Sequence, residues 1–435
     1  MAQVPVMPYL VDKLGAAGSS QYARLQTVFS AVQFVGGLIS GPLMDRYGGR
    51  FLLAVSFAAS MACYGLTASA SNLWMLYLSR LPTVLQHAVL AARAIVTQLS
   101  SEDDRARVLG YVAVSYSVGF TVGPAIGGLL SSVSLQFAAW VATLGSALSL
   151  ATVLLLLPDL PQNTGAGHEH QPGAAAGNGS AHHAGEQRVA KDGTSSDGIG
   201  GEQRKGGGLR HMLMAFVEVA RRPGLPSLLA GKVLVGLGGA VYTSMFPVLL
   251  QRRYGLDPKL NGMVMSYVGV LLLAGQGLLV GPVIAALGEP RTELLCVGAL
   301  VATYAVLAGC GSLWQVLVLM VPLSLAGMLY NNASTSRLTK AVLPQQRGTA
   351  LAVDMSFSSG VRMLSPALGS AAFDQLGHRS VPALSAALVG CFLLAVQLGI
   401  FAIPVREGRG GAGSEEGTRN EGEGEARDDE KEKAE

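Results

Sequence analysis

Charged residues are scarce in this chain. Only 14% of its 435 residues are Asp, Glu, Lys or Arg, whereas roughly 25% is usual in soluble domains. Aromatic residues make up 6%, half of the chain is hydrophobic, and the mean hydropathy is +0.41. This composition disfavours a soluble globular enzyme and indicates that most of the chain lies in a membrane.

The signatures of common enzyme and metal sites are absent too. The chain has no P-loop, no GxSxG and no HExxH motif, so it lacks the parts for ATP-driven pumping and for hydrolysis. Its four cysteines fall in apolar runs without CxxC or metal-ligand spacing, which excludes a small disulfide scaffold. They are Cys63, Cys296, Cys310 and Cys391. We therefore expect no enzyme activity, no cofactor, no metal site and no nucleic-acid partner.

Two segments hold more than half of the charged residues. Residues 406–435 carry 6 basic and 11 acidic side chains and no aromatic residue. Residues 158–224 carry 7 of each sign, are rich in Gly, Ala, Ser and His, and show no periodicity. They are predicted to be an acidic disordered tail and a disordered linker, the linker with a short amphipathic helix at His211–Val219. The remaining body is about 8% charged, as expected of membrane-embedded sequence.

Eleven apolar stretches are long enough to cross a bilayer of about 30 Å. They are Ala23–Met44, Phe51–Ala70, Leu73–Gln98, Leu109–Ser132 and Leu135–Leu157 before the linker, and Leu225–Leu250, Leu260–Leu287, Thr292–Cys310, Leu313–Ala333, Ala350–Ala372 and Ser380–Val405 after it. Met1–Leu14 resembles the final turns of one more helix, although 14 residues reach only about 21 Å. We expect either a truncated first helix, from a gene model that lacks its 5′ exon, or a short interfacial anchor.

An internal repeat of about 240 residues supports a count of twelve helices. Gly41-Pro42 recurs as Gly281-Pro282, Gly48 as Gly288, Leu73-Trp74 as Leu313-Trp314, Pro82 as Pro322, and SYSVG at Ser115–Gly119 as SFSSG at Ser356–Gly360. The predicted fold is therefore all-α and polytopic, with six-helix halves at residues 1–157 and 225–405. Such parallel repeats are typical of transporters with a substrate site near the membrane midplane, between the halves.

Basic residues in the short loops predict the orientation. If the helices alternate in direction, most of these residues fall on one side, which we take as the cytosolic side. They are Arg46, Arg50, Arg105, Arg107, Arg221, Arg222, Arg291, Arg337, Lys340 and Arg347, with Arg252, Arg253, Lys259 and Arg379 as exceptions. The linker and the tail are therefore expected in the cytosol, and the membrane is either the plasma membrane or an internal one.

The run GPLMDRYGGR resembles the signature between the second and third helices of the major facilitator superfamily. A glycine lets helices approach closely, an acid can cap a helix end, and arginines anchor the cytosolic face. The resemblance implies a gating latch formed by Gly41, Asp45, Arg46, Gly48 and Arg50, with Gly49 in place of one basic residue. The alternative is a positive-inside turn without a gating role.

A second run, GYVAVSYSVGFTVGPAIGG, matches the antiporter signature of the same superfamily. Its glycines allow a neighbouring helix to pack tightly, and its proline bends the helix. The signature residues are Gly110, Gly119, Gly123, Pro124, Gly127 and Gly128. The resemblance implies export coupled to proton exchange, whereas packing alone would still mark a membrane bundle.

Charged groups inside the predicted spans are candidates for proton coupling or substrate binding, because a charge in mid-bilayer is costly without a partner or water. Arg80 lies where the superfamily carries an arginine associated with proton coupling, or it snorkels to the outer interface. Asp354 is the only acid well inside a predicted span, and its partner is either Arg362, about two turns on, or a basic residue of another helix. The remaining candidates are Lys232, Asn331 and Gln33.

Two segments resemble the organic-cation-transporter-like members of solute carrier family 22, at residues 22–57 and 79–110. The resemblance implies a secondary transporter that exports organic cations or drug-like compounds in exchange for protons. Basic groups outnumber acidic ones in the spans, which fits an organic anion or amphiphile equally. We expect membrane lipid, a small organic solute and protons as partners, and a functional monomer. The other class is a receptor or scaffold that recruits partners through its linker and tail; a central cavity with polar groups favours the transporter.

Overall fold

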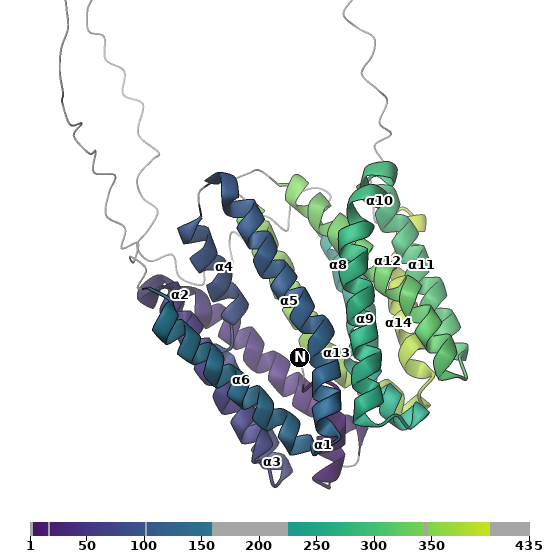
Figure 1. Ribbon diagram of the computed structural model, residues 1–435. Helices are drawn as coiled ribbons and strands as arrows, with labels where there is room; N and C mark the ends of the chain where they lie inside the picture. Colours follow the sequence, from purple (N-terminus) through teal and green to yellow (C-terminus); the bar gives the residue numbers. More distant parts are fainter. Residues whose placement is uncertain (1–2, 16–17, 101, 159–224, 343–346, 401–435) are drawn as a thin grey trace, which may run out of the picture. The chain divides into compact units, whose positions relative to one another are not determined.

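The computed structural model describes residues 3–15, 18–100, 102–158, 225–342 and 347–400, and these ranges contain helices and no strand (Figure 1). The first half has α1 (Met7–Lys13), α2 (Ser19–Ala68), α3 (Leu73–Leu78), η1 (Leu81–Leu85), α4 (Ala88–Leu99), α5 (Glu102–Ser131) and α6 (Leu135–Leu156). The second has α8 (Leu225–Tyr254), α9 (Pro258–Leu278), α10 (Val280–Leu287), α11 (Glu289–Gly309), α12 (Leu313–Lys340), α13 (Arg347–Leu376) and α14 (Ser380–Gln397). The predicted all-α fold is confirmed. Apart from Pro158, the predicted linker and tail lie outside the described residues.

Nine segments of the described residues are helical, long and apolar enough to cross a membrane, and they correspond to nine of the eleven predicted spans. The two others are Leu73–Gln98 and Ala350–Ala372. The second of these is covered by α13, a continuous 30-residue helix in which Asp354 and Arg362 offset the apolar residues. The predicted span Leu260–Leu287 is divided at Leu279 into α9 and α10.

The predicted span Leu73–Gln98 is not one helix, so this prediction was wrong. The chain instead forms α3, the 3₁₀ helix η1 and α4, with a non-helical link at Gln86 and His87. Pro82, in the first turn of η1, has no N–H to donate and disfavours an α-helical residue before it. Mean hydropathy does not detect such an interruption, because a broken segment can be as apolar as a continuous helix.

The two halves begin equivalent helices in the same way. α3 and α12 follow the N-cap residues Asn72 and Ser312, and each cap side chain accepts a hydrogen bond from the backbone N–H three residues on. Such caps satisfy one of the free N–H groups at a helix start. An exposed tryptophan, Trp74 or Trp314, lies two residues after each cap, as is common where a helix meets the membrane surface. The structure thus agrees with the repeat of about 240 residues.

Two helix pairs join the halves. α5 packs along α9, and α2 packs along α13 (Figure 1). We call the end of the helices at which α6 stops and α8 starts the linker side, and the opposite end the far side. On the linker side, the first turns of α8 pack on the end of α12 and the start of α13 through Leu225, Leu338 and Ala350, which are fully buried.

Candidate functional site

The gating signature surrounds a break in α2 on the linker side. Gly48 has φ +83° and ψ 165°, a conformation open to glycine alone, and it interrupts the helix. The Arg50 guanidinium donates to a backbone carbonyl near the end of α6 at 3.0 Å, and the Arg46 guanidinium lies 5.4 Å from the ring centroid of the adjacent tyrosine. A Cβ on Gly41 would meet no atom within 4 Å. The side chain of Asp45 lies outside the described residues, so gating by this signature remains a prediction.

The far-side part of the antiporter signature forms a close contact between the halves. A Cβ on Gly262 of α9 would lie 2.4 Å from the carbonyl oxygen of Pro124, and one on Gly128 would lie 2.8 Å from a backbone oxygen at the start of α9. The backbone N–H of Ala125 donates to the Ser266 hydroxyl at 2.8 Å. α5 and α9 therefore meet backbone to backbone here, which small residues allow.

The linker-side part of the signature has few neighbours. Of the ten residues from Gly110 to Gly119, eight are exposed and two are half-buried, and a Cβ on either end residue would meet no atom within 4 Å. Gly127 is buried and Gly123 half-buried on the tightly packed side of α5. The signature therefore extends from a closed contact between the halves to an open stretch of helix.

Polar contacts also join the halves on the far side. The Asp12 carboxylate of α1 pairs with the Arg252 guanidinium of α8 at 2.8 Å and accepts a hydrogen bond from the Gln251 amide, also at 2.8 Å. The Ser19 hydroxyl, at the start of α2, donates to the Asp374 carboxylate near the end of α13. Together with the α5–α9 contact, they hold the far-side ends of the two halves together.

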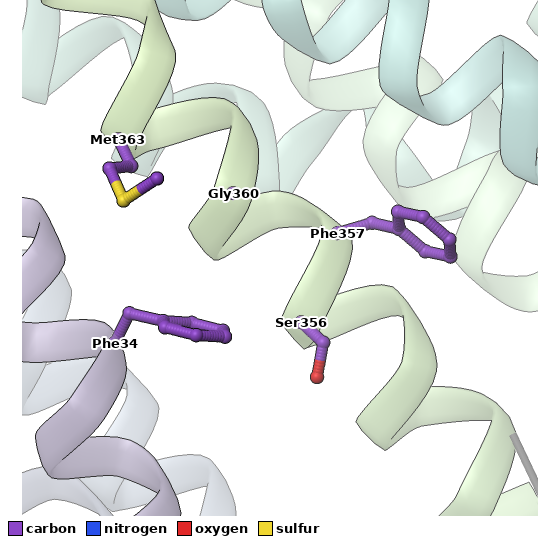
Figure 2. A pocket seen from close by; sticks show the side chains of 5 residues that line it. All are labelled: Phe34, Ser356, Phe357, Gly360 and Met363. Carbon is purple, nitrogen blue, oxygen red and sulfur yellow. The ribbon is translucent and has the colours of Figure 1, made fainter. Parts of the chain in front are cut away.

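A pocket of about 240 Å³ lies between the halves, where α2 faces α13. Figure 2 shows the Phe34 ring pointing from α2 toward the face of α13 that carries Ser356 and Met363, while the Phe357 ring points away from Phe34. Gly360 completes the lining. The predicted candidates do not line this pocket. Sequence reasoning missed its residues, although Ser356, Phe357 and Gly360 belong to the repeated run SFSSG.

Arg80 is buried inside the first half, at the start of η1, with 7% of its surface exposed. Its guanidinium donates to the Thr67 hydroxyl at 3.4 Å and contacts the Met7 sulfur at 3.5 Å. Its Nε has no hydrogen-bond partner, and none of the ion pairs among the described residues includes Arg80. A buried cation without an anionic partner is costly, and in membrane proteins such groups mark substrate or ion pathways.

The interruption beside Arg80 is stabilised by side chains of α2. The Ser56 hydroxyl donates to a carbonyl of η1 at 2.9 Å and accepts from the backbone N–H of His87 at 3.2 Å. The Gln33 amide donates to another carbonyl of η1 at 3.3 Å. Gly36 permits this approach, since a Cβ there would lie 2.0 Å from the Val84 carbonyl oxygen. Irregular backbone persists at membrane depth only where protein or water satisfies it, and broken helices commonly bound transporter substrate sites.

Asp354 pairs with Lys232. The Lys232 ammonium of α8 lies 2.7 Å from the Asp354 carboxylate of α13 and donates to the Thr335 hydroxyl of α12 at 2.8 Å. The two charged side chains are 8% and 15% exposed. The sequence left two possible partners for Asp354, namely Arg362 or a basic residue of another helix. The structure shows the second, because the partner is Lys232 of α8. Arg362 is exposed and donates to a serine one turn earlier at 3.2 Å, and Asn331 is exposed on α12.

A second acid, near the edge of a predicted span, is also buried. Glu293, within the predicted span Thr292–Cys310, is 1% exposed and pairs with Arg337 of α12. One turn earlier, Glu289 pairs with Lys340 and accepts from the Ser336 hydroxyl. Sequence reasoning placed Arg337 and Lys340 among the loop charges and did not single out Glu289 or Glu293, which lie within two turns of the start of α11. In the described part of the chain, no three His, Cys, Asp or Glu side chains group as metal ligands.

Helical halves joined by two helix pairs, a pocket between them and a broken helix beside a buried charge together define a membrane transporter. Comparison with known proteins identifies the family: the model of the Major Facilitator Superfamily matches residues 1–336 and 228–425. The chain belongs to the major facilitator superfamily, and it is a transporter and not an enzyme.

Similar proteins support this assignment. Human solute carrier family 67 member A1 is 28% identical over 386 residues, which cover 86% of this chain and 82% of that protein. Mouse solute carrier family 22 member 18 is 26% identical over 386 residues, 86% of each chain, which confirms the resemblance found in the sequence. The crystal structure of the human organic anion transporter MFSD10 (TETRAN) is 20% identical, covers 91% of this chain and 95% of its own, and superimposes with a TM-score of 0.60.

Proposed function

We propose that this protein moves a small organic solute across the membrane by alternating access, in exchange for protons, and that the linker side is the cytosolic side. The single observation that carries the proposal is the contrast between the two sides. Asp12–Arg252, Ser19–Asp374 and the α5–α9 contact join the halves on the far side. On the linker side, eight of the ten residues of α5 from Gly110 to Gly119 are exposed. This contrast supports a transporter that is open on the linker side.

Proton exchange is supported by buried charged side chains in each of the two halves. Arg80 lies beside a broken helix without an ion-pair partner among the described residues, and the Lys232–Asp354 pair lies on helices that contribute to the second half. A carboxylate that pairs with a lysine in a buried site can exchange that partner for a proton. The antiporter signature, with its closed and open parts, supports an exchanger.

The pocket favours a solute with an apolar body. Phe34, Phe357 and Met363 offer aromatic and thioether surface, and Ser356 adds one hydroxyl. Such a lining suits an organic cation or drug-like compound, because aromatic faces attract cations and methionine adapts to varied shapes. These features support a transporter over a receptor or scaffold, which needs no pocket between its halves.

An organic anion is the second candidate. Arg80 is a buried cation without an ion pair in the described part of the chain, whereas the Asp354 carboxylate already has a cationic partner. Uncompensated positive charge attracts an anionic solute. The likeness to the human organic anion transporter MFSD10 agrees with this alternative.

The test is a flux assay in proteoliposomes that hold the full chain. Ethidium serves as the cationic probe and p-aminohippurate as the anionic probe, and the lumen is acidic relative to the bath. We expect the outward proton gradient to drive uptake of one probe, and a protonophore to stop it. Replacement of Arg80 by Gln or Asp354 by Asn should abolish the response to the gradient while Arg362→Gln, on the exposed face of α13, retains it. Undiminished gradient-driven flux in both of the first variants would contradict the coupling.

A further inference from the structure

On the linker side of the second half, four helices bring ionisable side chains together. They are Lys232 of α8, Glu289 and Glu293 of α11, Tyr330, Arg337 and Lys340 of α12, and Asp354 of α13. Three ion pairs form among them: Lys232–Asp354, Glu293–Arg337 and Glu289–Lys340. The acids and bases are therefore equal in number, and one added proton would give the network a net positive charge.

Glu293 is an incompletely paired acid of this network. Its Oε2 accepts a hydrogen bond from Arg337, whereas its Oε1 has no partner among the described residues. The side chain is 1% exposed, so this oxygen is remote from bulk solvent. The hydroxyl of Tyr330, a residue 5% exposed, also lacks a partner in the described ranges. Buried polar groups in native proteins are almost always hydrogen-bonded, and exceptions commonly have a functional cause.

The chemistry of a carboxyl group explains how a proton would satisfy this oxygen. An ionised carboxylate accepts hydrogen bonds at both oxygens, and a buried oxygen that accepts none makes the charged form unfavourable. A proton on Oε1 forms an O–H bond, removes the charge and supplies a donor in place of the unpaired acceptor. The bond from Arg337 to Oε2 persists and keeps the carboxyl group in place. The incoming proton comes from hydronium and leaves a water molecule behind.

Ionisable side chains of three helices surround Glu293. Arg337 and Tyr330 face it from α12, and Lys232 faces it from α8. Glu289 of its own helix lies one turn closer to the linker side and also interacts with it. Lys232 is held at the same time by Asp354. Through Lys232, the charge on Glu293 therefore acts on the Asp354 pair.

The first half carries different residues at the equivalent positions. With the repeat of about 240 residues, Glu289 and Glu293 correspond to Gly49 and Leu53, and Arg337 and Lys340 to Thr97 and Ser100. Gly49 lies against α4, since a Cβ there would be 2.8 Å from the Ile95 side chain. The two acid–base pairs at these positions therefore belong to the second half alone.

A short route leads from the linker side to Glu293. Lys340, 68% exposed in its side chain, contacts Glu289, which is 13% exposed. Glu293 lies one helical turn deeper on the same face of α11. Protons that reach Glu289 from solvent are therefore one turn away from the unpaired oxygen.

We propose that Glu293 is a proton-binding site that exchanges with the linker side, with Arg337 as its positioning residue and Lys232 as its connection to Asp354. The proposal rests on the proposed proton exchange for its role in transport. Proton binding itself is independent of the transported solute, so it can be measured without one.

Infrared difference spectroscopy on the full chain in liposomes, during a pH titration without solute, tests the site directly. Among the protonated carboxyl stretches that titrate in the wild type, we expect one that is lost in Glu293→Gln and is shifted but retained in Glu293→Asp. Glu289→Gln is the matched control on the same helix and should keep the band. Persistence of every titrating carboxyl band in a folded Glu293→Gln protein would overturn the proposal, as would its loss in Glu289→Gln alone.

The flux assay separates this inference from the proposed function. If the site couples to transport, Glu293→Gln loses the dependence of ethidium or p-aminohippurate flux on the pH gradient, while exchange of labelled for unlabelled probe continues. A purely structural role would reduce both fluxes together, which would contradict the proposal. A titrating Glu293 in a protein that moves neither probe would leave the proton site intact and count against the proposed function instead.

Discussion

Gly48 and Gly288 occupy equivalent positions of the two halves and have nearly the same backbone conformation. Gly48 has φ +83° and ψ 165°, and Gly288 has φ +74° and ψ 160°. Residues with a Cβ are almost never found in this region of backbone conformation. Each glycine turns the chain between two helices on the linker side, so the same local device serves both halves.

Replacement of Gly48 or Gly288 by Ala should therefore destabilise the protein, by about 1–3 kcal/mol in each case. Thermal unfolding in detergent micelles measures the loss. Gly281→Ala is the matched control, because Gly281 is inside a helix and a Cβ there would meet no atom within 4 Å. Alanine is the better helix former, so this control should be neutral or slightly stabilising. Equal losses at all three positions would contradict the backbone argument.

A second prediction concerns the approach of α2 to the broken helix. A Cβ on Gly36 would lie 2.0 Å from the Val84 carbonyl oxygen, whereas one on Gly37 would lie 3.8 Å from the His87 ring. Gly36→Ala should push η1 away from α2 and so weaken the hydrogen bonds from Ser56 and Gln33. We expect a lower unfolding temperature and loss of gradient-driven flux in this variant. Gly37→Ala should retain both, and similar behaviour of the two variants would show that the close approach is unimportant.

The third prediction is a double-mutant cycle on Lys232 and Asp354. Breaking a buried ion pair by removing one partner leaves an uncompensated charge, at a cost of about 3–5 kcal/mol. Lys232→Met and Asp354→Asn should each lose stability by an amount of this order, and the double variant should lose less than the sum of the two. Arg362→Met, on the exposed face, should change stability by no more than about 0.5 kcal/mol. Additive losses in the cycle would show that the pair does not interact energetically.

The fourth prediction concerns pH. His378 lies in the loop between α13 and α14, where partial burial and then the nearby Arg253 and Arg379 lower the pKa of its imidazole below the usual 6.5. The unfolded chain therefore binds this proton more tightly than the folded one, and stability falls as the pH drops below about 6.5. His378→Gln should remove this part of the acid destabilisation. The difference in unfolding temperature between pH 8 and pH 5 measures it, and an unchanged difference in the variant would refute the assignment.

Hydropathy and the repeat predict much of the fold because both are local properties of the sequence. Nine spans appear as helices of the expected kind, and the caps at Asn72 and Ser312 correspond. Pro82 and Pro322 correspond as well, yet α12 continues through Pro322 while the first half is interrupted near Pro82. The interruption depends on side chains of α2 that receive the freed backbone groups, which the sequence of the broken segment does not contain.

The candidate site was predicted less completely, because its contacts also depend on side chains of helices far apart in the sequence. Lys232 and Asp354 are both recognisable as charges within apolar runs, but their pairing depends on how α8 meets α13. Glu293 lies so near the start of its helix that its sequence position resembles that of a loop charge, and only the packing of α12 shows that it is buried. Phe34 and Met363 carry no sequence signal beyond their place in apolar helices, and become pocket residues because α2 faces α13.

The broken segment between α3 and α4 also bears on how the chain is made. During synthesis, Leu73–Leu99 leaves the ribosome after α2, with a buried arginine and backbone groups that lipid cannot satisfy. Its partners Ser56 and Gln33 belong to that earlier helix. The segment therefore should not insert into the bilayer by itself, and we expect its insertion to require that α2 is still beside the translocon. A nascent chain without the Ser56 and Gln33 side chains should insert this segment poorly, before the second half is translated.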